Sequence, residues 1–130
     1  MPVVEISQAH WNQIVEHAQA DAPNECCGYM RMSDGRVEEV FPAENIKRSP
    51  YAFDLGFKDL VAANDLDDQG YGVAIYHSHP RSPAEPSQTD INVAQYPHWL
   101  YVIVSLAGEP EMRAWHIEDG RVQEEPVTVG

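Results

Sequence analysis

Cysteine is scarce in this sequence: the 130 residues contain two, Cys26 and Cys27, and they are neighbours in the chain. Adjacent residues of a strand point to opposite faces, so a disulfide between these two thiols would have poor geometry. The chain therefore has no disulfide framework, which is typical of proteins from a reducing compartment.

Long apolar runs are also missing. No stretch approaches the roughly 20 apolar residues that a membrane-spanning helix needs. The start of the chain lacks the charged segment and the apolar run of a secretory signal peptide. These absences predict a cytoplasmic protein with no membrane partner.

Positive charge is scarce as well, with 8 Lys and Arg against 21 Asp and Glu and a formal net charge of -13. A phosphate backbone is bound by clustered cations that release counterions, so this balance argues against a nucleic-acid partner. The surplus of acid is compatible with a basic protein partner or with solubility alone, and bulk charge does not choose between them.

The composition that is present fits a globular protein. Hydrophobic residues make up 43% of the chain, and its length is sufficient to bury a core. No internal repeat, low-complexity segment or linker divides the sequence. We therefore expect a single domain over residues 1–130.

Local patterns predict a mixture of helices and strands. Ser7 is a candidate N-cap, and apolar residues then recur at helical spacing until the chain nears Pro23. A second helix is expected within residues 55–68, and a short one near Ser87. Strands are expected at residues 26–32, 37–41, 71–76, 100–106, 111–117 and 122–129, with hairpin turns at Asp34-Gly35 and Asp119-Gly120. The predicted fold class is α+β, or mixed α/β, with a central, mostly antiparallel sheet flanked by two or three helices.

The sharpest pattern is His77-x-His79-Pro80 followed by Ser87-x-x-Asp90. If the strand continues through residue 79, its period of two places both imidazoles on one face. Pro80 turns the chain away from the sheet, and the returning segment places Ser87 and Asp90 on one helical face. Two nitrogens and one carboxylate oxygen then converge, which is the ligand set of catalytic zinc with its fourth position open to water.

Each half of this pattern also has a simpler interpretation. His-x-His at a strand end can be a pair of ordinary polar residues, and Ser87-x-x-Asp90 can be a helix cap. Capping gives no reason for two alternating histidines, so the combination strengthens the metal hypothesis, although spacing alone leaves both interpretations open. The other histidines lack partners at ligand spacing and are interpreted as surface or ordinary core residues: His10, His17, His98 and His116.

Taken together, His77-x-His79-Pro80, seven intervening residues and Ser87-x-x-Asp90 resemble the full signature of the JAMM (MPN-plus) metalloproteases. That family has a glutamate upstream, next to a small-residue motif that ends in glycine, and Glu25-Cys26-Cys27-Gly28 resembles it. The resemblance spans residues 7 to 118 in the order of elements. It implies a cytidine-deaminase-like MPN/JAMM fold and a Zn²⁺ ion held by His77, His79 and Asp90.

The resemblance also implies catalytic roles. Glu25 would be the general base that takes a proton from the metal-bound water and delivers it to the leaving amine. The hydroxyl of Ser87 would help zinc to stabilise the oxyanion. Without the family, Glu25 is one acid among many and is interpreted as a solvated charge. Cys26 and Cys27 have three open interpretations: zinc ligands, lining of the site, or packing.

The JAMM family cleaves amide bonds, commonly isopeptide or C-terminal bonds of ubiquitin-like proteins. The short chain, its segment from Glu25 to Gly28 and its ending from Asp119 to Val127 are similar to small bacterial Mec-type members of the family. Those members remove cysteine from the C-terminal glycine of a ubiquitin-like sulfur carrier protein, a reaction of cysteine biosynthesis. The resemblance thus implies a zinc metallopeptidase, of isopeptidase or carboxypeptidase type, whose partner is a carrier with a Gly-Gly tail.

Three other functions stay open. The chain could be a general deconjugase of ubiquitin-like proteins or a peptidase that trims carrier tails to expose Gly-Gly. Metal-free relatives of the fold act as scaffold modules, but the complete ligand set of this chain argues against that role. The sequence does not choose between a monomer and a homodimer.

Overall fold

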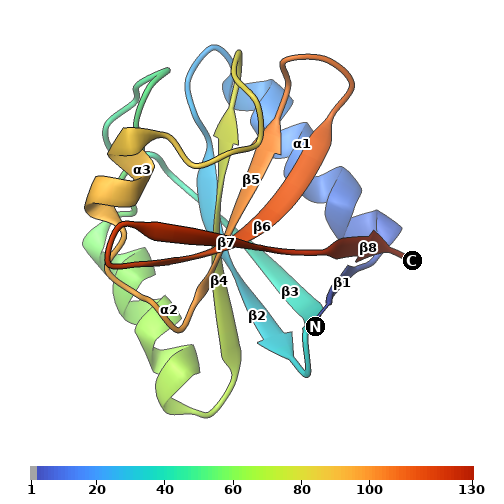
Figure 1. Ribbon diagram of the computed structural model, residues 1–130, viewed down its shortest axis with the longest axis vertical. Coiled ribbons are helices and arrows are strands. Elements are labelled where there is room, and N and C mark those ends of the chain that lie inside the picture. The colour runs from blue at the N-terminus through green and yellow to red at the C-terminus, as the bar shows by residue number, and fades with distance from the viewer. Residues whose placement is uncertain (1–2) are drawn as a thin grey trace.

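The computed structural model describes residues 3–130 (Figure 1). The elements in chain order are β1 (Val4–Ile6), α1 (Gln8–Asp21), β2 (Cys27–Ser33), β3 (Arg36–Ala43), α2 (Phe57–Asp68), β4 (Gly72–His79), α3 (Gln88–Val93), β5 (Leu100–Ser105), β6 (Glu111–Glu118), β7 (Arg121–Glu125) and β8 (Val127–Val129). None of the helices in these residues is long and apolar enough to cross a membrane.

All eight strands of the described chain join one sheet in the order β7-β6-β5-β4-β2-β3-β1-β8. Four neighbouring pairs run antiparallel, namely β2·β3, β2·β4, β5·β6 and β6·β7. Three pairs run parallel, namely β1·β3, β1·β8 and β4·β5. The predicted α+β fold with a mostly antiparallel sheet and two or three helices is confirmed.

The first helix begins where the sequence predicted. Ser7 has an extended backbone, and its Oγ accepts the backbone N–H of His10 at 3.1 Å, which caps the first turn of α1. Ile14, Val15 and Ala18 are buried in the core beneath this helix. The apolar spacing of the sequence therefore correctly identified the face of α1 that packs on the sheet.

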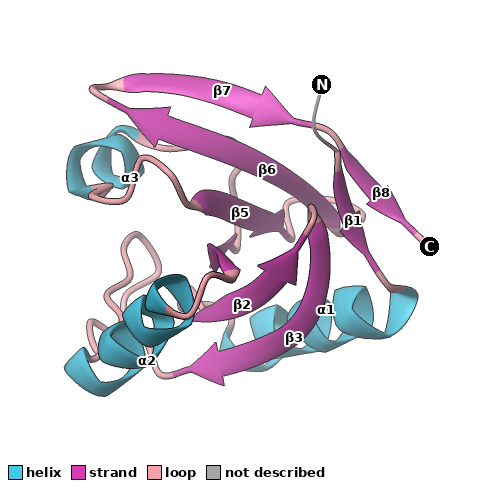
Figure 2. Cartoon of the chain, turned by 90° about the horizontal axis from the view of Figure 1, so that it is seen from below, coloured by secondary structure: helices cyan, strands magenta, loops and turns pink. Residues whose placement is uncertain are grey.

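The two faces of the curved sheet carry different helices (Figure 2). On one face, Ala74 and Tyr76 of β4 pack into the core formed with α1. On the other face, Val73 and Ile75 pack into the core that contains Ala63 of α2. Side chains alternate between the faces of a strand, so residues 77 and 79 of β4 project toward the side of α2 and α3.

Both predicted hairpins are present. Asp34-Gly35 joins β2 to β3, and Asp119-Gly120 joins β6 to β7. The φ angles of these residues are 51° and 79° in the first turn and 51° and 76° in the second. Positive φ at both central positions is the requirement of a two-residue type I′ turn, which Asp-Gly tolerates well.

The prediction of one strand over residues 122–129 was wrong. Pro126 divides this segment, so that β7 ends at Glu125 and β8 begins at Val127. Proline has no backbone N–H to donate to a ladder, and pairing with β6 stops there. β8 instead pairs in parallel with β1, a three-residue strand that no local pattern had indicated.

Candidate metal centre

Strand β4 continues through His79, so both histidines of the motif are strand residues. Both imidazoles lie on the face covered by α2 and α3, as the period of two predicted. Ser78 between them faces the α1 side, where its Oγ accepts the backbone N–H of Cys26 at 2.7 Å. All three side chains of this segment are buried.

Asp90 reaches the same place from the beginning of α3. Ser87 caps this helix: its Oγ accepts the N–H of Asp90 at 3.0 Å, and its own N–H donates to Oδ2 of Asp90 at 3.0 Å. The capping interpretation of Ser87-x-x-Asp90 is therefore confirmed. It does not compete with a metal site, because the same Oδ2 also faces the two imidazoles and the cap holds the carboxylate in place.

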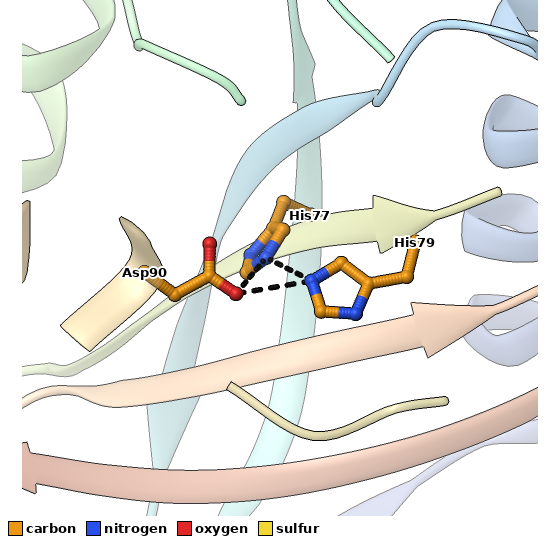
Figure 3. Close-up of side chains that lie close together, drawn as sticks. All are labelled: His77, His79 and Asp90. Atoms are coloured by element: carbon orange, nitrogen blue, oxygen red, sulfur yellow. Dashed lines mark hydrogen bonds and ion pairs between the residues drawn. The ribbon is translucent and has the colours of Figure 1, made fainter. Parts of the chain in front are cut away.

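Three potential ligand atoms meet at one point (Figure 3). Nε2 of His77 and Nε2 of His79 are 3.2 Å apart, and Oδ2 of Asp90 lies 3.1 Å from the first and 3.0 Å from the second. Around a tetrahedral ion with bonds of about 2.0–2.1 Å, neighbouring ligand atoms are about 3.3 Å apart. The cluster therefore has nearly the dimensions that a small tetrahedral cation requires.

Hydrogen bonding fixes which nitrogen of His79 faces the cluster. Its Nδ1 lies 2.8 Å from the carbonyl oxygen of Pro83. That oxygen can only accept, so Nδ1 carries the proton and, in the neutral ring, Nε2 presents a lone pair to Asp90. Two acceptors this close repel one another unless a cation or a proton lies between them. The donor set of two imidazole nitrogens and one carboxylate oxygen fits zinc.

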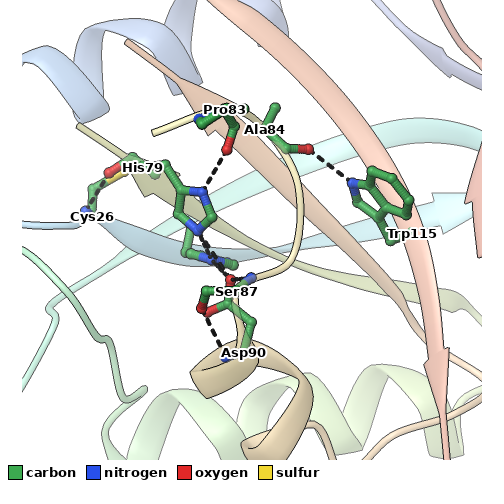
Figure 4. Close-up of polar contacts among 9 residues, drawn as sticks. Cys26, His79, Pro83, Ala84, Ser87, Asp90 and Trp115 are labelled. Atoms are coloured by element: carbon green, nitrogen blue, oxygen red, sulfur yellow. Dashed lines mark hydrogen bonds and ion pairs between the residues drawn. The ribbon is translucent and has the colours of Figure 1, made fainter. Parts of the chain in front are cut away.

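The loop between β4 and α3 is held by three buried side chains, two of which are drawn in Figure 4. The carbonyls of residues 82, 83 and 84 accept hydrogen bonds from Oγ of Ser105 at 2.6 Å, Nδ1 of His79 at 2.8 Å and Nε1 of Trp115 at 3.0 Å, respectively. Three successive carbonyls are thus fixed, which sets the path by which the chain returns to Ser87. The sequence carries no local signal for the bonds from Ser105 and Trp115, because these residues lie on β5 and β6.

Burial and hydrogen bonds act on the charges of the three candidate ligands. Burial lowers the pKa of His77, which favours its neutral ring. Burial opposes ionisation of Asp90, but hydrogen bonds from His77 and His79 hold the pKa of this carboxyl well below its usual range. Burial also favours neutral His79, yet hydrogen bonds to Asp90 and Pro83 outweigh it and raise its pKa. Metals bind neutral imidazoles and carboxylates, so a cation at this site would compete with a proton for Nε2 of His79.

Glu25 lies beside this cluster, just before β2. Cys27 pairs with His77 in the register of β2 and β4, and the N–H of Ser78 donates to the carbonyl of Cys26, so the same register continued to residue 25 would bring Glu25 opposite His79. Glu25 is 4% exposed, and its Oε1 has no hydrogen-bond partner within residues 3–130. Burial raises its pKa to about 8, and the charges of His79 and Asp90 also act on it. It is a buried carboxyl group whose Oε1 lacks a hydrogen-bond partner, close enough to His79 and Asp90 for their charges to act on it.

In the metal-free protein, Glu25→Gln is expected to increase the free energy of unfolding, by an amount that grows between pH 4.5 and about 8. The folded state keeps Glu25 protonated up to its raised pKa, whereas the unfolded chain ionises it earlier, so the wild type loses stability through this window. The slope is at most about 1.4 kcal/mol per pH unit. Urea titrations of both proteins across the window measure the difference, and a difference independent of pH would contradict the raised pKa.

The two cysteines have separate surroundings. Cys26 packs in the core on the α1 side. Cys27 lies on the face of the site, where its thiol donates to the carbonyl of Glu44 at 3.6 Å. Burial raises the pKa of both thiols to about 12, which keeps them protonated. Among the residues described, neither cysteine belongs to the ligand group, which argues against their interpretation as zinc ligands, and each packs in one of the two cores.

The four other histidines also lie outside the ligand group found in residues 3–130. Three of them have ordinary partners: His17 bonds the hydroxyl of Tyr76 at 2.7 Å, His98 contacts Asp67 at 2.8 Å and His116 contacts Glu125 at 3.4 Å. Their interpretation as surface or ordinary core residues agrees with these contacts.

A pocket of about 260 Å³ opens beside His77 and Asp90. Its walls come from α2, α3, the strands of the sheet and the loop after β3, and they include Leu60 and Tyr101. Phe53 of that loop stacks on the ring of His77, with the ring centroids 4.4 Å apart. Sequence reasoning missed this pocket because its walls are distant from one another in the chain.

The model of one protein family, Prok-JAB, described as prokaryotic homologs of the JAB domain, matches residues 7–118. The chain belongs to this family. The resemblance to JAMM proteins that the motif indicated is therefore confirmed.

The sequence is similar to those of peptidases from other organisms over most of its length. CysO-cysteine peptidase of Mycobacterium tuberculosis is 41% identical over 126 residues, which are 91% of this chain and 85% of that protein. Desampylase of Haloferax volcanii is 34% identical over 105 residues, which are 77% of this chain and 76% of that protein. The chain is accordingly a JAMM-type metallopeptidase homologue with the buried His-His-Asp cluster that this chemistry needs.

Solved structures agree with the fold. A solution structure of a protein from Desulfitobacterium hafniense has a TM-score of 0.82 and 30% identity, over 98% of this chain and 92% of that chain. A JAB1/MPN domain protein from Archaeoglobus fulgidus has a TM-score of 0.61 and 19% identity, over 98% of this chain and 100% of that chain. The expected MPN/JAMM fold is confirmed by these similarities.

Proposed function

We propose that this protein is a zinc peptidase that hydrolyses the amide bond at the C-terminal glycine of a ubiquitin-like sulfur carrier protein and releases cysteine. The observation that carries the proposal is the convergence of His77, His79 and Asp90 at one point, with Glu25 close enough for the charges of His79 and Asp90 to act on it. The identity of 41% with a CysO-cysteine peptidase supports the choice of substrate. The three convergent side chains would hold the zinc ion.

Glu25 acts as the general base in this proposal. When bound, zinc lowers the pKa of its water to about 7 and so supplies a nucleophile at neutral pH. The carboxylate of Glu25 takes the proton from the attacking water and delivers it to the leaving amine. Its pKa is raised by burial to about 8. A neighbouring cation lowers the pKa of a carboxyl, which brings Glu25 toward the range where it can both accept and donate at neutral pH.

In the same proposal, the hydroxyl of Ser87 donates a hydrogen bond to the oxyanion that forms on the substrate carbonyl. Its Oγ already accepts the N–H of Asp90, which leaves its own hydroxyl proton free to donate. The side chain is exposed at the beginning of α3, one turn from the carboxylate of Asp90. A donor at this position stabilises the negative charge that develops on the carbonyl oxygen.

The pocket beside His77 and Asp90 supports the choice of a flexible C-terminal tail as substrate. Glycines without side chains allow the tail backbone to approach buried ligands closely. Apolar walls such as Leu60 and Tyr101 suit an apolar residue upstream of the glycines. The formal net charge of -13 favours a carrier that presents a basic face.

A second function is supported by two relatives. Desampylase of Haloferax volcanii is 34% identical, and a probable TtuB-protein conjugate cleaving protease of Thermus thermophilus is 35% identical over 81% of this chain and 70% of that protein. Cleavage of conjugates between a ubiquitin-like protein and other proteins would use the same His77, His79, Asp90 and Glu25. The leaving group would then be a lysine side chain instead of cysteine.

Mass spectrometry of sulfur carriers extended beyond Gly-Gly separates these functions. Carriers that end in one cysteine, in another single residue or in a longer peptide are incubated with the zinc-loaded protein, next to a lysine-linked conjugate. We expect rapid loss of the terminal cysteine alone. Equal trimming of all extensions would favour a tail-processing peptidase, and cleavage of the conjugate alone would favour a deconjugase. Either result contradicts release of cysteine as the main reaction.

A further inference from the structure

The loop of residues 44–55 holds the backbone of Glu25 on both sides. The N–H of Glu25 donates to the carbonyl of Ser49 at 2.9 Å. The carbonyl of Glu25 accepts Nδ2 of Asn45 at 3.0 Å. β2 begins only at Cys27, so these two bonds tie the backbone of Glu25 to the loop. The position of the glutamate therefore depends on the conformation of a segment about 20 residues further along the chain.

Asn45 is the anchor of this loop. Its amide is 4% exposed, and besides Glu25 its Nδ2 donates to the carbonyl of Ala52 at 3.0 Å. Its Oδ1 accepts the backbone N–H groups of Lys47 and Asp54, each at 3.1 Å. Both donors and both lone pairs of the amide are used. One buried side chain thus ties both ends of the loop to each other and to Glu25.

The same loop contacts a metal ligand and the pocket. Phe53 stacks on the ring of His77 with an angle of 19° between the ring planes. Lys47, Phe53 and Asp54 all line the pocket beside His77. A substrate tail in this pocket would therefore touch the loop of residues 44–55, and the same loop holds the backbone of Glu25 through Asn45 and Ser49.

We infer that Asn45 is a positioning residue: its direct bond to the carbonyl of Glu25, together with its bonds across the loop of residues 46–54, holds Glu25 beside His79. The catalytic consequence of this inference rests on the proposed function, whereas the hold of Asn45 on Glu25 concerns the chain alone. Asn45 has no contact with the ligand atoms, so its loss acts on turnover and not on metal binding. Displacement of a catalytic group by about 1 Å is enough to cost about 100-fold in rate.

Asn45→Asp tests the inference. The carboxylate keeps the acceptor for Lys47 and Asp54, but it loses both donors and places an oxygen against the carbonyls of Glu25 and Ala52. We expect kcat to fall about 100-fold with unchanged zinc content and little change in KM. Hydrogen exchange of the Glu25 amide and of the loop amides should become faster, while exchange in β4 stays as in the wild type.

Asn64→Asp is the matched control. Asn64 is a half-buried amide whose Nδ2 donates to the carbonyl of Leu60 within α2 and to the hydroxyl of Tyr96 at 3.4 Å, and it has no hydrogen bond to the loop of residues 44–55. This variant should keep the wild-type kcat and the wild-type exchange at Glu25. If Asn45→Asp does not fold, Asn45→Ser, which places a small neutral hydroxyl at the same position, is measured in the same way.

Three results would overturn the inference. The first is an unchanged kcat with unchanged exchange at the Glu25 amide, and the second is a fall in kcat without faster exchange there. The third is a loss of zinc in proportion to the loss of turnover, because Asn45 would then act on the metal site. Exchange needs no substrate, so it decides whether Asn45 holds Glu25 even if no extended carrier is cleaved, a failure that would count against the proposed function alone.

Discussion

Glu25→Gln is expected to lower kcat by about 100- to 10,000-fold while the protein still binds about one zinc ion per chain. The amide of glutamine has nearly the shape of the carboxylate, but it cannot accept and return the proton of the attacking water. The atoms of His77, His79 and Asp90 that converge on the site are unchanged by this substitution. The rate of cysteine release from an extended carrier and elemental analysis of the purified protein measure the two quantities.

Glu125→Gln is the matched control for this experiment. Glu125 is also 4% exposed, but it lies on β7 and contacts His116 instead of the ligands. The control should keep both its zinc and its turnover. Retained turnover in Glu25→Gln would remove this residue from the role of base. Loss of zinc in parallel with turnover would make Glu25 a metal ligand.

The convergence of His77, His79 and Asp90 was predictable because each part of it depends on local geometry. His77 and His79 share a face through the period of a strand, and β4 does extend through both. Ser87 and Asp90 share a face through the spacing of a helix, and the same spacing builds the capping box. The one assumption beyond local structure was that α3 returns to the end of β4.

Glu25 could not be placed by local reasoning. Its position opposite His79 follows from the pairing of Cys27 with His77, and register between segments about 50 residues apart has no signature in either segment. The family resemblance nominated Glu25, and the strand register explains why that residue lies beside the ligands. Its raised pKa is a consequence of the burial that this register produces.

The loop around Asn45 and the supports of residues 82–84 were missed for the same reason. An asparagine in a polar stretch is ordinary, and only the folded chain shows that Asn45 bonds the carbonyl of Glu25. Likewise, Ser105 and Trp115 are apolar-strand residues by pattern, although each donates to a loop carbonyl. Strand β1 was missed because three residues are too few to show a period, and its pairing with β8 is non-local.

His77→Ala is expected to remove most of the zinc from the purified protein and with it nearly all turnover. Two ligands would remain of the three that converge, and a catalytic zinc site ordinarily keeps three protein ligands. The metal also stabilises the folded state, since a ligand present at 100 times its Kd contributes about 2.7 kcal/mol. Removal of metal by a chelator should therefore lower the Tm of the wild type clearly and that of His77→Ala very little.

His98→Ala is the matched control for the loss of an imidazole, because His98 contacts Asp67 at the surface and lies outside the ligand group. It should keep its zinc and its response to the chelator. His77→Ala also removes the ring on which Phe53 stacks, so a fall in the Tm of the metal-free protein is expected from lost packing alone. The response to the chelator separates the loss of stabilisation by the metal from the loss of packing, because only the former depends on the chelator. A variant that keeps both its zinc and the wild-type response would show that the metal is held elsewhere, and the three convergent atoms would then be only a buried hydrogen-bonded cluster.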